Sequence, residues 1–277
     1  MKLMNARGVR DFPPEEKIIR QKVVDILKKT FEEFGFNPLE TPIIERYDVL
    51  SSKYAGGTEI LKETFRLKDQ GGRDICLRYD LTVPFSRFVG MNPNIKLPFK
   101  RYQIGRVYRD GPIKLGRYRE FWQCDVDVVG TRNMMSDAEL IVIASKVFEK
   151  LGLDVIIKLN NRKILDGIMS FAGVPEKKWV STILSIDKLE KQGKNEVIKE
   201  LKQKNIRDDV IAKIFGMIQK QGSNKENMNN LKLFLKKGFG KEGLEEIEEM
   251  LGYLKTLKVK VDFDPSLARG LSYYTGS

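Results

Sequence analysis

A run of basic side chains occupies the connection between two predicted β-strands, residues 101–109 and 121–129. The connection is long for a β-hairpin, and it contains Lys114, Arg117 and Arg119. Guanidinium groups bind phosphate oxygens through paired hydrogen bonds, so a basic loop on a rigid hairpin suits a polyphosphate ligand. A solvated hairpin tip with ordinary surface charge would contain the same residues. The pattern alone leaves both interpretations open.

Polar side chains share one face of the second predicted strand. Alternation with period two places Gln123, Asp125 and Asp127 on one side of residues 121–129 and apolar side chains on the other. Residues 75–82 alternate in the same way, and their polar face consists of Arg78, Asp80 and Thr82. Carboxylates that face an ammonium group in a partly dry site form hydrogen bonds of about 1.5–3 kcal/mol each. These faces predict either a cleft for a cationic small molecule or a solvent-exposed sheet, and periodicity does not separate the two.

The sequence contains no histidine, which excludes every mechanism that needs an imidazole base and most zinc ligand sets. Its two cysteines, Cys76 and Cys124, form no CxxC pair. This argues against a zinc site or a disulfide framework and favours a reduced, cytoplasmic protein. The phosphate loop GxxxxGK[ST] does not occur either. Any chemistry must therefore use carboxylates, guanidinium groups, amines, hydroxyls or a hard cation.

Basic residues exceed acidic ones, with 50 Lys and Arg against 38 Asp and Glu and a net charge of +12. Polyanions are therefore plausible partners, although charge alone does not distinguish nucleic acid from nucleotide or from a contribution to solubility. No apolar stretch is long enough to span a bilayer, and the first residues lack the apolar run of a secretory signal. We expect no contact with a membrane.

Hydrophobic periodicity predicts the elements that must position these residues. Apolar side chains recur at helical spacing over residues 14–34 and 136–152, whereas residues 38–50 contain two prolines and predict an extended edge before a short helix. From residue 164 the chain becomes rich in Lys, Gln, Asn and Glu with short helical periods, and it later returns to extended, aromatic sequence. We predict a core over residues 1–163, a helical insertion domain over 164–256 and a return to the core over 257–277.

Five motifs together resemble the histidyl-tRNA synthetases, a class II aminoacyl-tRNA synthetase family, in their archaeal or eukaryotic style. They are GVRDF, TPIIERYDVL, LRYDLTVPFSR, YQIGRVYRDGPIKLGRYREFWQCDVDVVG and LARGLSYYTG, and the resemblance covers nearly the whole chain. It implies an α+β fold in which an antiparallel sheet is flanked by helices and carries a helical insertion domain.

The resemblance implies a set of residues for ATP and for catalysis. Arg109 matches the arginine that holds the α-phosphate, and Phe121 matches the residue that stacks on adenine. Arg117 and Arg119 fall in the mobile loop that approaches the phosphates, and Arg269 matches the arginine that stabilises the activated phosphate. ATP with Mg²⁺ is expected as a substrate complex, with no metal held by protein ligands and no tightly bound cofactor.

The resemblance also implies six histidine-binding residues, which are Asp80, Thr82, Gln123, Asp127, Tyr273 and Tyr274. In this assignment Asp80 and Thr82 hold the α-amino group, whereas Asp127 and Tyr274 read the imidazole. Pro42, in the TPIIERYDVL motif, matches a proline at the dimer interface, so a homodimer is expected.

These assignments predict a histidine–tRNA ligase that converts histidine and ATP to histidyl-adenylate and transfers the amino acid to tRNA(His). Two departures qualify the match. Ser272 replaces an aspartate that the family usually has, and the chain ends at Ser277, inside a motif that relatives continue. Relatives then carry class II motif 3 and an anticodon-binding domain. We therefore expect a fragment with weak or no aminoacylation and some residual adenylate synthesis.

Two alternatives belong to other classes of protein. One is a non-catalytic relative that acts as a regulatory subunit of ATP phosphoribosyltransferase; such relatives generally lose the arginine that Arg269 matches and parts of motif 2, to which Arg109 belongs. The other is a basic nucleic-acid-binding module, for which the net charge and the lysine-rich insertion are the motivation. That insertion could contact the tRNA acceptor stem, or it could be a solvated helical satellite.

Overall fold

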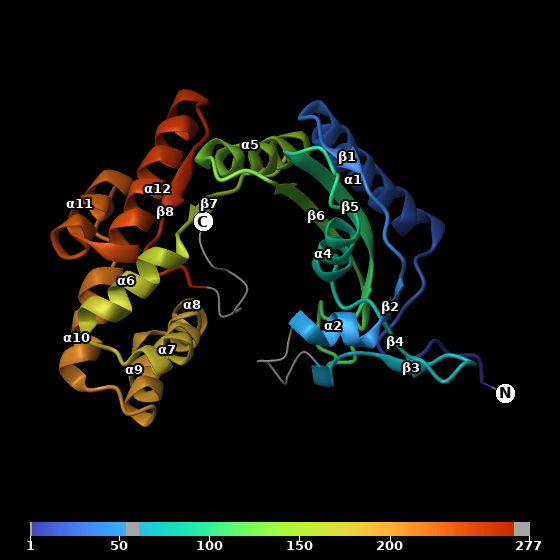
Figure 1. Ribbon diagram of the computed structural model, residues 1–277, viewed down its shortest axis with the longest axis horizontal. Helices are drawn as coiled ribbons and strands as arrows, with labels where there is room; N and C mark the ends of the chain where they lie inside the picture. The colour runs from blue at the N-terminus through green and yellow to red at the C-terminus, as the bar shows by residue number, and fades with distance from the viewer. Residues whose placement is uncertain (1, 54–60, 269–277) are drawn as a thin grey trace. The chain divides into compact units, whose positions relative to one another are not determined.

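A computed structural model describes residues 2–53 and 61–268 of the chain (Figure 1). Internal contacts divide the chain into two compact units, Met1–Arg132 and Asn133–Ser277. The predicted site residues up to Asp127 belong to the first unit. None of the helices in the described ranges is both long and apolar enough to cross a membrane.

The first unit opens with helix α1, Pro14–Glu33. Proline at its first position lacks only an N–H that would be unpaired there, and its fixed φ suits the start of a helix. Gly35 follows the end with φ of +74°, a left-handed conformation that glycine adopts without strain. The helix buries Val24 and Phe31, and the ring of Phe31 packs 5.4 Å from that of Tyr102. This confirms the helix predicted over residues 14–34.

The main sheet is built on the predicted hairpin. Strand β5, Phe99–Tyr108, pairs antiparallel with β6, Glu120–Val129, and β1, Asn37–Pro38, pairs parallel with the other edge of β5. Directly opposed residues share a face, so Arg101 lies beside Asp127. The predicted alternation of β6 is therefore confirmed.

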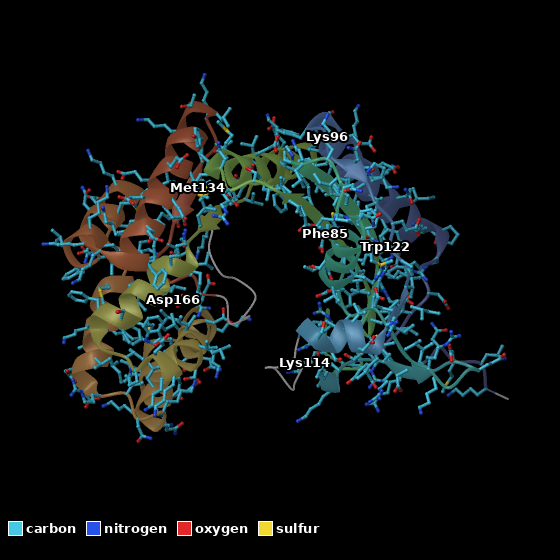
Figure 2. All side chains as sticks on the ribbon, in the orientation of Figure 1. Phe85, Lys96, Lys114, Trp122, Met134 and Asp166 are labelled. Carbon is cyan, nitrogen blue, oxygen red and sulfur yellow. The ribbon has the colours of Figure 1, made fainter. Side chains whose placement is uncertain are left out.

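Different helices cover the two faces of the hairpin. The face with Tyr102 packs on α1, and the opposite face, with Phe99, packs on Phe85 of helix α4, Thr82–Met91. Figure 2 labels Phe85, which belongs to α4, and Trp122, which lies on the side of α1. The polar face of β6 thus lies under α4.

A second small sheet joins β2, Ile44–Arg46, β4, Asp74–Leu77, and β3, Arg66–Lys68, with β4 in the middle. Helix α2, Tyr47–Lys53, follows β2, and its Leu50 is fully buried. The extended segment that runs into a short helix is therefore confirmed.

The strand predicted over residues 75–82 was wrong in its second half. Strand β4 ends at Leu77, and Thr82 is the first residue of α4. The carboxylate of Asp80 accepts a hydrogen bond of 2.9 Å from the N–H of Val83, which satisfies a donor at the start of the helix. Leu81, like Asp80, is buried, so the two sides of this segment do not separate into polar and apolar faces.

The second unit is mainly helical. It begins with α5, Met134–Lys150, whose first turn is capped by the side chain of Asn133. Strands β7, Ile157–Leu159, and β8, Val261–Phe263, pair in parallel and bring the two flanks of the predicted insertion side by side. The elements between them are α6 (Arg162–Ala172), a 3₁₀ turn (Glu176–Lys178), α7 (Trp179–Ile186), α8 (Leu189–Gln192), α9 (Lys194–Gln203), α10 (Asp208–Ile218), α11 (Asn224–Phe234) and α12 (Gly238–Thr256).

One stretch of this unit has the glycine spacing of a dinucleotide-binding loop. GFGKEG, residues 238–243, follows helix α11 rather than a strand, so it lacks the context of that motif. Its glycines instead allow α12 to approach α6. A Cβ on Gly167 of α6 would lie 2.5 Å from the Cα of Gly240. The spacing is explained by helix packing.

These elements confirm an α+β fold with an antiparallel sheet flanked by helices. The predicted boundaries of the insertion domain, at residues 163 and 256, stay a prediction. The division of the chain after Arg132 is made by internal contacts and does not test them.

Candidate active site

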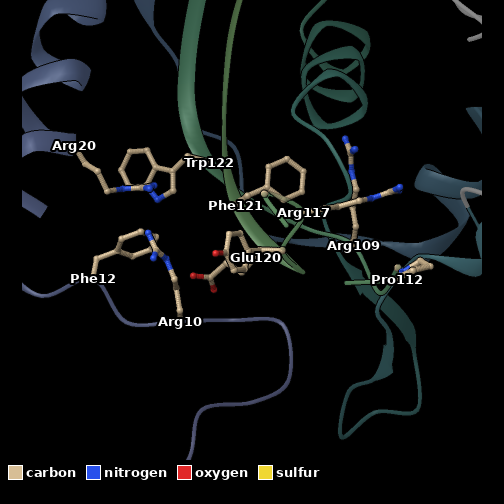
Figure 3. A pocket seen from close by; sticks show the side chains of 12 residues that line it. Arg10, Phe12, Arg20, Arg109, Pro112, Arg117, Glu120, Phe121 and Trp122 are labelled. Atoms are coloured by element: carbon tan, nitrogen blue, oxygen red, sulfur yellow. The ribbon is translucent and has the colours of Figure 1, made fainter. Parts of the chain in front are cut away.

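A cavity of about 480 Å³ lies at the end of the hairpin, and its walls are basic and aromatic (Figure 3). Figure 3 shows Trp122 with Arg20 and Phe12 on one side of β6, and Phe121 with Arg109 and Arg117 on the other. Three of the four residues predicted to bind ATP therefore meet at one cavity, and the loop predicted to be basic forms part of its wall.

Arg109 is held between two aromatic rings. Its guanidinium carbon lies 4.3 Å from the centre of the Tyr79 ring and 4.9 Å from that of Phe121. Its Nε donates to the carbonyl oxygen of Tyr79 at 3.3 Å. Cation–π contacts and this hydrogen bond fix a charge that a phosphate group could bind.

Arg117 makes an ion pair with Glu63, with 3.4 Å between Nη2 and Oε1. The same carboxylate accepts a hydrogen bond of 3.2 Å from the hydroxyl of Tyr79, and the backbone carbonyl of Glu63 accepts one of 2.7 Å from the N–H of Asp110. The segment before β3 therefore holds the hairpin loop. Glu63 was not predicted, because its partner lies 54 residues away.

Arg119 points elsewhere and does not line the cavity. Its guanidinium makes an ion pair with Asp110 at 2.9 Å. Its backbone N–H donates to the carbonyl oxygen of Gly8 at 2.8 Å. Gly8 has φ of +86°, and a Cβ there would lie 2.8 Å from the Arg119 side chain. The GVRDF segment thus packs on the loop, and contact between Arg119 and ATP stays a prediction.

The cavity also contains residues that the sequence did not predict, with Arg10 and Phe12 from the GVRDF segment and Arg20 from α1. Arg10 stacks on Phe12 at 4.4 Å and Arg20 stacks on the same ring at 3.9 Å. Arg10 also pairs with Glu16 at 2.8 Å. Arg10 belongs to the GVRDF motif, which is the signal in the sequence that could have identified it, whereas nothing in the pattern of α1 distinguishes Arg20.

The residues predicted to bind histidine continue along the same face of the hairpin. The amide nitrogen of Gln123 donates to both carboxylate oxygens of Asp125 at 3.0 Å. Within the described ranges, the amide oxygen of Gln123 is buried and makes no hydrogen bond. Burial raises the pKa of Asp125, and the hydrogen bond from Gln123 acts against that shift. A cationic ligand would relieve this concentration of acceptors.

Asp127 forms an ion pair with Arg101 across the ladder, with 2.6 Å between the two side chains. Arg101 is fully buried. Burial lowers its pKa, and the neighbouring carboxylates, that of Asp127 foremost, act to raise it. Asp80 is another of these carboxylates and lies at the start of α4 beside Thr82. The structure thus brings Asp80 and Asp127 to the same side of the hairpin.

Three predicted site residues, Arg269, Tyr273 and Tyr274, lie outside the described residues. Pro42 is exposed, beside the exposed Ile43 and Ile44, and its role in a dimer stays a prediction. Among the described residues, no group of three or more acidic or cysteine side chains is arranged to hold a metal ion.

The antiparallel hairpin sheet with helices on both faces, the arginine at the exit of its first strand and the carboxylates on its second agree with the class II aminoacyl-tRNA synthetase core that the resemblance implies. The model of the family described as histidyl-tRNA synthetase matches residues 8–277. The chain belongs to the histidyl-tRNA synthetase family.

Curated relatives extend this result. The chain is 44% identical to histidine–tRNA ligase 1 of Bacillus anthracis, over 100% of this chain and 65% of that protein. It is 40% identical to histidine–tRNA ligase of Bacteroides fragilis strain YCH46, over 98% and 65%. The chain therefore spans 65% of the length of these relatives.

Solved structures agree on the fold. Histidyl-tRNA synthetase from Nostoc sp. PCC 7120 superposes with a TM-score of 0.88 at 31% identity, covering 100% of this chain and 64% of that one. An ATP phosphoribosyltransferase regulatory subunit/histidyl-tRNA synthetase from Bacillus halodurans superposes with a TM-score of 0.84 at 21% identity, covering 100% and 71%. The second likeness concerns the fold alone.

Proposed function

We propose that the chain is the catalytic part of a histidine–tRNA ligase and that it forms histidyl-adenylate from histidine and ATP. The observation that carries the proposal is the order of side chains along one hairpin face. Arg109 and Phe121 lie at the cavity, and Asp127 lies six residues further along β6. Six residues of strand span about 20 Å, which is the scale of an amino acid joined to a nucleotide.

The reaction begins with attack by a carboxylate oxygen of histidine on the α-phosphorus of ATP. A phosphorus–oxygen bond forms, the bond to the β-phosphate bridging oxygen breaks, and pyrophosphate leaves with the Mg²⁺ that entered with ATP. The nucleophile is already ionised at neutral pH, so no base is required and the lack of histidine side chains is no obstacle. Catalysis then depends on positioning and on neutralising charge.

The described residues suit those two tasks. Arg109, fixed between two rings, would neutralise charge on the α-phosphate while Phe121 supports the adenine. Arg117 would exchange Glu63 for a phosphate oxygen. Asp80 and Thr82 would hold the ammonium group. These roles, and the role of Arg269 at the activated phosphate, rest on the family resemblance.

The second step would transfer the histidyl group to the 3′ end of tRNA(His). The net charge of +12 supports binding of a polyanion, and the family resemblance supports a homodimer in the cytoplasm. Both the tRNA and the second copy are proposed partners.

Histidine-dependent exchange of pyrophosphate into ATP tests the proposal. We expect exchange that requires histidine, is abolished by Arg109→Ala and is slower than in a full-length relative. Exchange that is independent of histidine, or that any amino acid supports equally, would contradict it.

A regulatory subunit like the ATP phosphoribosyltransferase regulatory subunit/histidyl-tRNA synthetase of Bacillus halodurans is the second candidate, because its fold superposes on this chain with a TM-score of 0.84. Such a protein would bind histidine without pyrophosphate exchange. The presence of Arg109 at the cavity favours the catalytic candidate.

A further inference from the structure

Among the described residues of the first unit, Arg101 is the most deeply buried charged side chain. It lies in the third position of β5, and its exposed fraction is 0%. Its guanidinium carbon lies 4.1 Å from the centre of the Phe85 ring, so α4 closes over it. Arginine is rarely buried to this extent unless it is paired. A specific interaction must therefore account for it.

Its contacts differ from those of Arg78, the other buried arginine on this face. Arg78 donates to two backbone carbonyls, that of Arg106 at 2.8 Å and that of Thr41 at 2.6 Å. It therefore ties backbone segments together. Across the part of the chain that the structure describes, no guanidinium nitrogen of Arg101 makes a regular hydrogen bond, and its ionic contact is with Asp127.

Folding alone gives little reason to keep such a pair. Removing the charge of Arg101 from water is costly, whereas the side chain of Asp127 stays 34% exposed, and replacement of a buried arginine and its partner by apolar residues is often neutral or stabilising. The pair also lies on the face that carries the predicted histidine-binding residues. The effect of Arg101 on the charge and orientation of Asp127 explains the pair better than folding does.

The charged surroundings of Arg101 are almost entirely acidic. Asp125 and Asp127 of β6 and Asp80 before α4 all act on it electrostatically, as does the thiol of Cys124, whereas the residue of α4 in contact with it is uncharged. Burial, and then the carboxylates of Asp127 and Asp80, raise the pKa of Asp125, and the charge of Arg101 acts against that shift. Arg101 is the cation that balances them.

We propose that Arg101 is a positioning residue for recognition of the imidazole. It holds Asp127 ionised and in one orientation, and by balancing the charge of Asp127 it makes the site select the neutral imidazole over the imidazolium. The inference rests on the proposed function, in which Asp127 reads the imidazole. Arg101 is enclosed by β6 and α4, so it acts through Asp127 rather than on the substrate.

A double-mutant cycle on the 277-residue chain tests the coupling, with histidine affinity measured by calorimetry. We expect Arg101→Met to weaken histidine binding by about 30-fold, within the range for residues in direct contact. In an Asp127→Asn background the same substitution should change affinity by less than about threefold. Equal losses in both backgrounds, or no loss in either, would overturn the proposal.

The pH profile tests selection of the neutral imidazole. An imidazole with a pKa of about 6.5 loses about tenfold of its neutral form between pH 7.5 and 5.5, so wild-type affinity should fall by that factor. Arg101→Met should lose most of this dependence, and Arg101→Lys, which keeps the charge, should retain it. Arg78→Met is the matched control for losing a buried arginine, and it should keep the wild-type profile. A wild-type profile in Arg101→Met would overturn the proposal.

The outcomes distinguish a failure of the proposed function from a failure of the role assigned to Arg101. If the wild-type chain binds no histidine, the proposed function fails first. If Arg101→Met does not fold, the comparison of Asp127→Asn with Arg101→Met/Asp127→Asn carries the test, because the double variant removes both charges of the ion pair. A loss of more than about tenfold between those two variants would overturn the role assigned to Arg101.

Discussion

Replacing Glu63 with Gln should strengthen the binding of ATP. The carboxylate of Glu63 holds the guanidinium of Arg117 at 3.4 Å, and Arg117 is expected to bind ATP phosphates. The ion pair must open before Arg117 reaches a phosphate, so it competes with the nucleotide. Gln keeps an acceptor for the hydroxyl of Tyr79 but removes the charge that holds Arg117.

The expected change in ATP affinity follows from the solvent exposure of the Arg117 side chain. The Arg117 side chain is 53% exposed, so the pair has the small free energy of a solvent-screened ion pair, about 0.2–1 kcal/mol. At 25 °C this corresponds to a factor of about 1.4 to 5 in affinity. We expect Glu63→Gln to lower the KM for ATP by that factor and to leave kcat near the wild-type value. The difference in KM for ATP between wild type and Glu63→Gln should shrink as salt is added, because salt screens the ion pair.

The assay is pyrophosphate exchange as a function of ATP concentration at saturating histidine. In an Arg117→Ala background, Glu63→Gln should have no effect on the KM for ATP. Glu149→Gln is a matched control, because it breaks the exposed pair with Lys146 in the second unit. An unchanged KM in Glu63→Gln, or an equal fall in the Arg117→Ala background, would refute the competition.

Three further predictions concern activation and stability. Arg269→Ala should depress adenylate formation far more than histidine binding, and equal losses in exchange rate and calorimetric affinity would count against its role. Gly105→Ala should destabilise the chain by about 1–3 kcal/mol in urea unfolding, because the new Cβ would lie 2.5 Å from Nη2 of the buried Arg78. Gly90→Ala, which meets open space in α4, should be neutral or stabilising by up to about 1 kcal/mol, and equal behaviour of the two would refute the packing argument. Hydrogen bonds from Lys188 and then Lys204 lower the pKa of Glu200 to about 2, so its contribution to stability is present above about pH 4.5 and is lost as the pH falls toward 2. The difference in unfolding free energy between wild type and Glu200→Gln should therefore narrow from pH 7 to pH 3, and a constant difference would contradict this.

Sequence alternation predicted the hairpin correctly because its two faces meet different helices. Trp122 lies on the side of α1 and Gln123 on the side of α4, so period two is imposed by packing on both sides. The same argument failed after Leu77. There the carboxylate of Asp80 accepts from the N–H of Val83 and starts a helix, a local hydrogen bond that alternation does not detect.

The parts of the site that escaped prediction depend on long-range contacts. Arg101 has the residue type of an exposed strand position, and only its pairing with Asp127 and its closure by Phe85 explain its burial. Glu63 meets Arg117 because β3 and β4 carry the preceding segment to the hairpin loop. Neither contact leaves a periodic or spaced signal in the chain.

A crystal structure of the chain with a non-hydrolysable histidyl-adenylate analogue tests the central claim most directly. We expect the adenine against Phe121, the phosphate isostere beside Arg109 and the imidazole at Asp127, with the ion pair between Asp127 and Arg101 intact. An analogue bound on another surface, or one oriented with its imidazole toward Phe121, would contradict the account.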